Sequence, residues 1–102
     1  MAASRMAEAK PAKPVPWIRK TAQVLRRHGA SEVFLFGSRA SGAASSESDL
    51  DLAVRGLPDE VFFRAYAHAS LACPVELDLV SLDDSNPFTD FLLKEGPLVR
   101  VA

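Results

Sequence analysis

Hydrophobic and polar residues alternate along the chain with two different periods, and these periods outline the secondary structure. Apolar side chains recur at helical spacing over residues 17–28, with basic residues around the other side and Gly29 as a natural helix end. A second helical pattern covers 58–72, and a third begins with cap-forming residues at 84–87 and ends at Gly96. Short apolar stretches typical of strands lie at 33–36, 50–54, 75–80 and 98–101.

Length and composition are those of one domain. The 102 residues are 48% hydrophobic and 25% charged, which is sufficient for a single core. Residues 1–16 hold three prolines and little large apolar content, so we expect a flexible arm ahead of a domain at 17–102. No apolar run reaches the ~18–20 residues of a membrane span, and the N-terminus lacks the apolar segment of a secretory signal. The single cysteine, Cys73, excludes an internal disulfide, so we expect a cytoplasmic protein.

Charge is distributed unevenly between the two parts of the chain. Residues 1–40 carry eight basic and two acidic side chains, whereas residues 41–102 carry four basic and eleven acidic ones. The basic part indicates either a face for an acidic partner or a basic arm followed by a solvated helix face. The acidic part is more specific, because some of its carboxylates fall within predicted strands and could hold cations.

Three aspartates occupy alternate positions on two of the predicted strands. Asp49 and Asp51 share one face of the strand at 50–54, because successive side chains of a strand point to opposite faces. On the strand at 75–80, Asp78 likewise points to the face opposite that of the apolar side chains. If these strands are neighbours, the three carboxylates form one cluster, which is unfavourable without a cation. Converging carboxylate oxygens suit Mg²⁺ or Mn²⁺, which also bind phosphates.

A Gly-Ser pair stands where a buried strand ends. Residues 37–48 are rich in Gly, Ser and Ala, and we expect a loop with room for one helical turn. Gly37 allows a phosphate to approach the backbone closely, Ser38 adds a hydroxyl, and Arg39 adds a planar cation suited to phosphate oxygens. The pair alone is a weak signal, but ten residues separate it from Asp49, and that combination is specific.

These residues resemble the signature of the minimal nucleotidyltransferase family, within the DNA polymerase β-like nucleotidyltransferase superfamily. The signature is Gly-Ser, ten residues, and Asp-x-Asp, and Gly37 and Ser38 followed by Asp49 and Asp51 match it. Asp78 lies on the strand that looks like the one bearing the third carboxylate of the family. The resemblance covers nearly all of the chain except the arm.

The resemblance implies a fold, a cofactor and a partner. The fold is α+β, with a short mixed β-sheet packed by helices. Two Mg²⁺ ions, with Mn²⁺ as an alternative, would be held by the three aspartates, and ATP would be the substrate. The Gly-Ser pair would hold the β- and γ-phosphates, and Arg39 would offset triphosphate charge. Family members are described as antitoxins that transfer AMP from ATP to a tyrosine of a HEPN-domain toxin.

A second class of function stays open at this point. The chain could be a non-catalytic antitoxin or nucleotide-binding module that neutralises its partner by direct contact. The carboxylate cluster favours the enzyme, since a purely binding role needs no group of repelling charges. Direct nucleic-acid binding is disfavoured. Other polar residues have plainer interpretations: Glu76 as a solvated neighbour, His28 as a structural helix end, and Trp17 as a packing residue.

Overall fold

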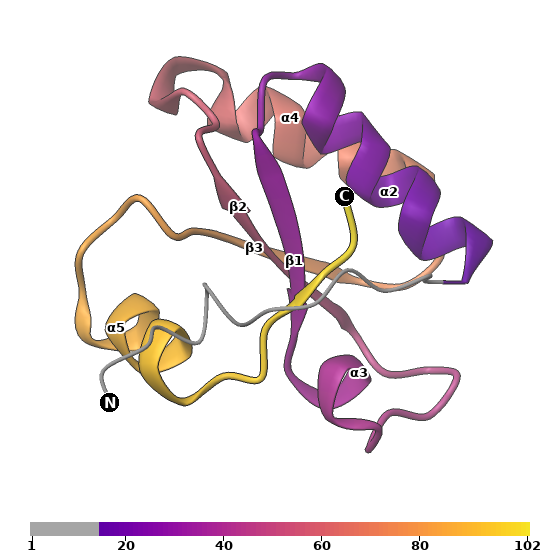
Figure 1. The fold of residues 1–102 in the computed structure, drawn as a ribbon. Coiled ribbons are helices and arrows are strands. Elements are labelled where there is room, and N and C mark those ends of the chain that lie inside the picture. The colour runs from indigo at the N-terminus through magenta and orange to yellow at the C-terminus, as the bar shows by residue number, and fades with distance from the viewer. Residues whose placement is uncertain (1–14) are drawn as a thin grey trace.

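A computed structural model describes residues 15–102 of the chain as an α+β domain built on one mixed sheet (Figure 1). Its strand order is β3-β2-β1-β4, with β1 antiparallel to both β2 and β4, and with β2 parallel to β3. The elements in chain order are α2 (Pro16–Arg27), β1 (Glu32–Phe36), α3 (Ser38–Ser41), β2 (Leu50–Arg55), α4 (Asp59–Ala72), β3 (Leu77–Ser81), α5 (Pro87–Glu95) and β4 (Val99–Arg100). The predicted fold class is confirmed.

Helices cover both faces of the sheet. On one face α2 and α4 lie side by side, and α5 covers part of the other (Figure 1). Alternate residues of β1 follow this division: Val33 and Leu35 face α2 and α4, whereas Phe34 and Phe36 face α5. Every residue from 33 to 36 is therefore buried, as the uninterrupted apolar run predicts.

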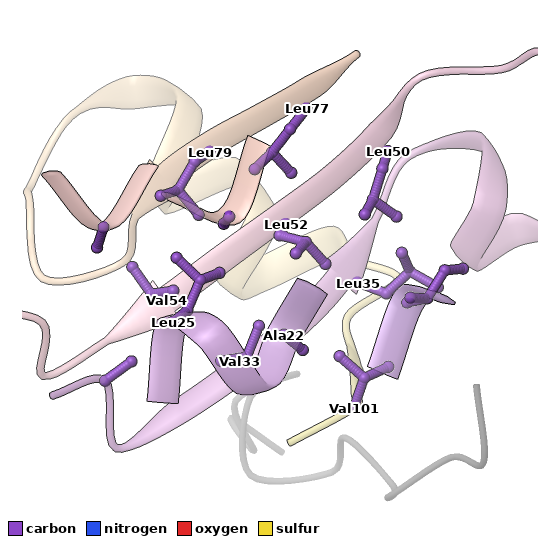
Figure 2. Packing of buried hydrophobic residues seen from close by; sticks show 14 of the residues in the cluster. Ala22, Leu25, Val33, Leu35, Leu50, Leu52, Val54, Leu77, Leu79 and Val101 are labelled. Atoms are coloured by element: carbon purple, nitrogen blue, oxygen red, sulfur yellow. The ribbon is translucent and has the colours of Figure 1, made fainter. Parts of the chain in front are cut away.

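The larger core lies between the sheet and the α2–α4 pair. Figure 2 shows Ala22 and Leu25 of α2 directed at the strands, where Leu52 and Val54 of β2 meet them. These four side chains have almost no exposed surface. Burying a leucine or valine side chain stabilises the fold by about 1.5–3 kcal/mol relative to leaving it exposed. This core holds β2 and β3 side by side.

The N-terminus of α5 is set by a capping box. The Asn86 side chain accepts a hydrogen bond from the Thr89 backbone N–H at 2.9 Å, and the Thr89 hydroxyl accepts one from the Asn86 N–H at 3.2 Å. Pro87 follows as the first helical residue, where its missing N–H has no cost. Such a cap contributes about 1 kcal/mol. The predicted helix start is confirmed.

Some element boundaries differ from the sequence pattern. The third strand begins at Leu77 rather than at residue 75, and β4 is reduced to two residues. Nevertheless, hydrogen bonds extend the pairing on each side: Leu50 N–H donates to the Glu76 carbonyl at 2.8 Å, and Val101 N–H to that of Val33 at 2.9 Å. The apolar pattern in the sequence shows where a segment becomes buried, whereas a residue counts as part of a strand only where the hydrogen-bonded ladder is complete.

The two histidines form a pair that the sequence did not reveal. His28 Nε2 and His68 Nδ1 are 2.8 Å apart and hydrogen-bonded, and the rings lie at a centroid distance of 4.8 Å. His28 is the C-cap of α2, and His68 lies on α4. The pair therefore joins the two helices, in agreement with a structural role for His28.

The predicted arm at 1–16 lies outside the described residues except for its last two. Pro16 is the first residue of α2, one position earlier than the sequence pattern indicates. Within residues 15–102, none of the helices combines the length and the apolar character needed to cross a membrane.

Candidate active site

The sheet places Asp51 and Asp78 next to each other. In the parallel pairing of β2 with β3, these two residues are register partners, so their side chains lie on the same face. This face is the one that carries α5, because Ala53, two residues after Asp51, belongs to the α5 core. The condition under which the sequence brings Asp78 to Asp51, that the two strands are neighbours, is therefore met.

Asp78 is close enough to affect the protonation of Asp51. Burial raises the pKa of Asp51 above its ordinary value, and the negative charge of Asp78 and a hydrogen bond with its side chain raise it further. Asp49 contributes in the same direction, and Arg39 opposes them. The site therefore favours positive charge, supplied by a proton or by a cation.

Asp49 stands at the open side of the pair. It directly precedes β2 and is exposed, whereas the next residue, Leu50, is fully buried in the larger core. In the part of the chain that the structure describes, no three acidic, histidine or cysteine side chains stand at metal-binding distances. The donor set still fits Mg²⁺: Asp51 and Asp78 supply adjoining hard oxygens, and Asp49 is a third carboxylate near enough for its charge to act on Asp51.

Gly37 brings the backbone against the carboxylates. It links β1 to α3 with φ +72° and ψ −154°, a conformation that is essentially restricted to glycine. A Cβ atom at this position would overlap the Asp51 carboxylate. The first turn of α3 folds over it, as the N–H groups of Ala40 and Ser41 both donate to the Gly37 carbonyl at 3.1 Å. Ser38, half-buried, therefore lies at the edge of the carboxylate site.

Arg39 ties the segment before β2 in place. Its Nη2 donates to the Ser48 carbonyl at 2.6 Å and to that of Ser46 at 3.4 Å, and its Nε donates to the Asp49 carbonyl at 3.2 Å. The guanidinium also lies 4.9 Å from the centre of the Trp17 ring, within cation–π range. These contacts hold the Asp49 backbone beside Asp51. Contact of Arg39 with a triphosphate stays a prediction.

Trp17 therefore has a role that the sequence pattern did not indicate. Sequence reasoning took it as a packing residue, and it does pack on the larger core. However, its ring also supports Arg39, 22 positions later in the chain. Nothing in the local pattern could reveal this contact, because it depends on how α2 crosses the sheet.

Aromatic side chains border the site on the side opposite Asp78. Phe36 is the register partner of Asp51 in the antiparallel pairing of β1 with β2. The Phe88 ring, from α5, packs edge-to-face on Phe36, with centroids 5.7 Å apart and an interplanar angle of 65°. Phe88 is 47% exposed. Sequence reasoning predicted the start of α5 but missed Phe88.

Two further acidic residues, Glu76 and Asp83, lie just outside the two ends of β3. Asp83 follows β3 and uses its carboxylate locally: Oδ2 accepts a hydrogen bond from the Gly56 N–H at 2.7 Å, and Oδ1 lies 3.6 Å from Arg55 Nη1. These are the contacts of a residue that fixes a turn. Glu76 is exposed, as expected for a solvated neighbour.

Under metal-free conditions, Asp51→Asn is expected to be more stable than the wild type at neutral pH. Because folding raises the pKa of Asp51 above 3.8, the folded state binds this proton more tightly than the unfolded chain does, and ionisation lowers stability. This loss of stability is absent below pH 3.8. It grows as the pH rises through the folded-state pKa of Asp51 and is constant above that pKa. Thermal unfolding with chelator across this range should show a gap between the two proteins that narrows toward acid.

Glu76→Gln is the matched control, since it removes an exposed carboxylate from the same region. It should show a much smaller gap at neutral pH. A variant Asp51→Asn that is less stable than the wild type at every pH would contradict the description of Asp51 as a carboxylate whose pKa is raised by folding.

Comparison with known proteins identifies a family and a fold. Residues 19–100 match the family model described as polymerase beta, nucleotidyltransferase. A chain from the crystal structure of a toxin–antitoxin with AMP-PNP has a similar fold, with 20% identity and a TM-score of 0.62 over 86% of this chain and 75% of that one. A chain from a mutant MntA–HpeT toxin–antitoxin is also similar, with 20% identity and a TM-score of 0.59 over 81% and 71%. Among curated proteins, none gives a significant match.

Proposed function

Because the chain belongs to the polymerase β nucleotidyltransferase family, we propose that it transfers a nucleoside monophosphate, AMP from ATP, to a hydroxyl group of a protein. The observation that carries this proposal is the position of Asp51. Its carboxylate is held between Asp78 on one side and the Gly37 backbone on the other. A carboxylate pair beside a glycine turn is the arrangement needed to hold cations and a triphosphate together.

The acidic residues and the glycine turn have different roles in this proposal. Asp49, Asp51 and Asp78 would hold two Mg²⁺ ions, which when bound neutralise phosphate charge and lower the pKa of the acceptor hydroxyl. Gly37 and Ser38 hold the β- and γ-phosphates. Arg39 keeps the Asp49 backbone in place and adds positive charge near the triphosphate.

The reaction is an in-line displacement at the α-phosphorus. The acceptor oxygen forms the new P–O bond, the bond from the α-phosphorus to the oxygen bridging to the β-phosphate breaks, and pyrophosphate leaves. In this proposal Asp78, which is exposed beside Asp51, takes up the acceptor proton. Holding both reactants in this geometry supplies much of the rate enhancement.

The acceptor we propose is a tyrosine of a partner HEPN toxin, and the protein would act as its antitoxin. Two proteins of similar fold are components of toxin–antitoxin complexes, and one of these structures contains AMP-PNP. In this chain Asp49 and Asp78 are both exposed, so a hydroxyl on another protein can approach the carboxylates from solvent.

Transfer should be detected directly with the purified protein, MgATP and a HEPN-type toxin encoded beside it. We expect the mass of the toxin to increase by one AMP, and chelator to prevent the increase.

ATP affinity measured by calorimetry should fall at least about tenfold without Mg²⁺, because the carboxylates repel an uncompensated triphosphate. Equal ATP affinity with and without chelator would contradict the metal-dependent site. Toxin inhibition without an adduct, retained by Asp49→Asn, would instead establish a non-catalytic antitoxin.

A further inference from the structure

Two aromatic side chains of α5 are directed outward from the helix that covers the carboxylate face. Thr89 and Leu92 form the buried side of α5, whereas Phe88 is 47% exposed and Phe91 is 54% exposed. Single exposed apolar residues are common on protein surfaces and carry no argument by themselves. Phe88 differs from Phe91 in its position relative to the carboxylates.

Phe88 is connected to the site through one buried ring. Its edge-to-face contact is with Phe36, which is only 7% exposed and is the register partner of Asp51. Phe36 also directly precedes Gly37, whose backbone approaches the Asp51 carboxylate. Phe88 therefore offers a ring to solvent beside both the carboxylates and the glycine turn.

The order of the strands places this ring on the side of Asp51 opposite Asp78. In the sheet, β2 lies between β3, which carries Asp78, and β1, which carries Phe36. An attacking hydroxyl must approach opposite to the leaving pyrophosphate. With the β- and γ-phosphates at Gly37 at the end of β1, the acceptor approaches from the Asp78 side. The nucleoside is bonded to the α-phosphorus off the line that joins the attacking and leaving oxygens, so it extends sideways from that line. Phe88 lies away from the acceptor, across Asp51 from Asp78, and offers an exposed ring to a nucleoside that extends in its direction.

We propose that Phe88 is the nucleobase-binding residue of this enzyme and stacks on the purine of the nucleotide. This inference rests on the proposed function, because it assumes a triphosphate held by Gly37 and the aspartates. A nucleobase is a flat π-system, and stacking on an aromatic side chain is the common way in which proteins bind unpaired bases. The larger ring system of a purine buries more surface on Phe88 than a pyrimidine does, so the site prefers purine nucleotides.

The test separates base binding from phosphate binding. Calorimetry with Mg²⁺ should compare ATP with inorganic tripolyphosphate, which has the phosphates but no base. Phe88→Ala is expected to weaken ATP binding by about 5- to 100-fold, the range of one base–aromatic stack, and to leave tripolyphosphate binding unchanged. In the transfer assay the same variant should raise KM for ATP with little change in kcat.

Two further variants control for packing. Phe91→Ala removes an equally exposed ring one turn further along α5 and should leave ATP affinity unchanged. Phe88→Leu keeps an apolar contact on Phe36 but has no ring, so it should lose affinity like Phe88→Ala, whereas Phe88→Trp should retain it.

Each outcome either supports or overturns the assignment of Phe88 as the nucleobase-binding residue. Loss of ATP affinity without loss of tripolyphosphate affinity supports the assignment. Unchanged ATP affinity in Phe88→Ala, or equal loss for both ligands, overturns it while the proposed function stands. If the wild type binds neither ATP nor tripolyphosphate, the proposed function fails, and this inference fails with it.

Discussion

Asp49→Asn and Asp51→Asn are each expected to lower the rate of nucleotide transfer by more than about 100-fold, with the protein still folded. Loss of a group that merely orients a metal ligand typically costs 10–100-fold, and these aspartates are proposed as the ligands themselves. Asparagine has the same shape as aspartate, and Asp51 lies among other carboxylates, so removing its charge does not weaken the core. The measurement is the initial rate of label transfer from ATP to the toxin, with circular dichroism to establish folding.

Glu76→Gln is the control for this experiment as well. Glu76 is exposed two residues before Asp78 and has no proposed part in catalysis, so transfer should continue at the wild-type rate. Wild-type transfer by Asp51→Asn would show that the carboxylate pair is not the catalytic centre.

Gly37→Ala is expected to abolish triphosphate binding and to destabilise the protein. The backbone at Gly37 has φ +72° and ψ −154°. A non-glycine residue in this region of backbone conformation lowers the stability of the fold by about 1–3 kcal/mol. In addition, the new methyl group would overlap the Asp51 carboxylate, so either the turn or the carboxylate must move. Both groups belong to the proposed site. ATP and tripolyphosphate calorimetry measures the first effect, and thermal unfolding measures the second.

Gly42→Ala separates these two effects. Gly42 also has a positive φ, +87°, but a Cβ atom there would meet no atom within 4 Å. This variant should lose about 1–2 kcal/mol of stability from backbone strain and still bind ATP. If Gly37→Ala and Gly42→Ala reduced ATP affinity equally, the close approach of Gly37 to Asp51 would have no functional meaning.

Local patterns in the sequence were sufficient to predict most of the elements of this fold. The apolar period changes where helices give way to strands, and caps such as Asn86 mark where helices start. Alternation along a strand also placed Asp51 on the face opposite Leu50 and Leu52, which the structure confirms. These features depend on neighbours a few residues apart, and such neighbours are visible in the sequence itself.

Tertiary structure decided which distant residues meet. The parallel register that joins Asp51 to Asp78 depends on how α4 crosses from β2 to β3, and the alternation within each strand is compatible with several registers. The same holds for the Trp17 ring under Arg39, the His28–His68 pair and the Phe88 ring on Phe36. Each of these contacts joins residues at least 22 positions apart and arises only when helices pack on the sheet. The sequence therefore determined which side chains are available as ligands, whereas packing determined their environment: the burial that raises the pKa of Asp51 and the aromatic rings of Phe36 and Phe88 beside it.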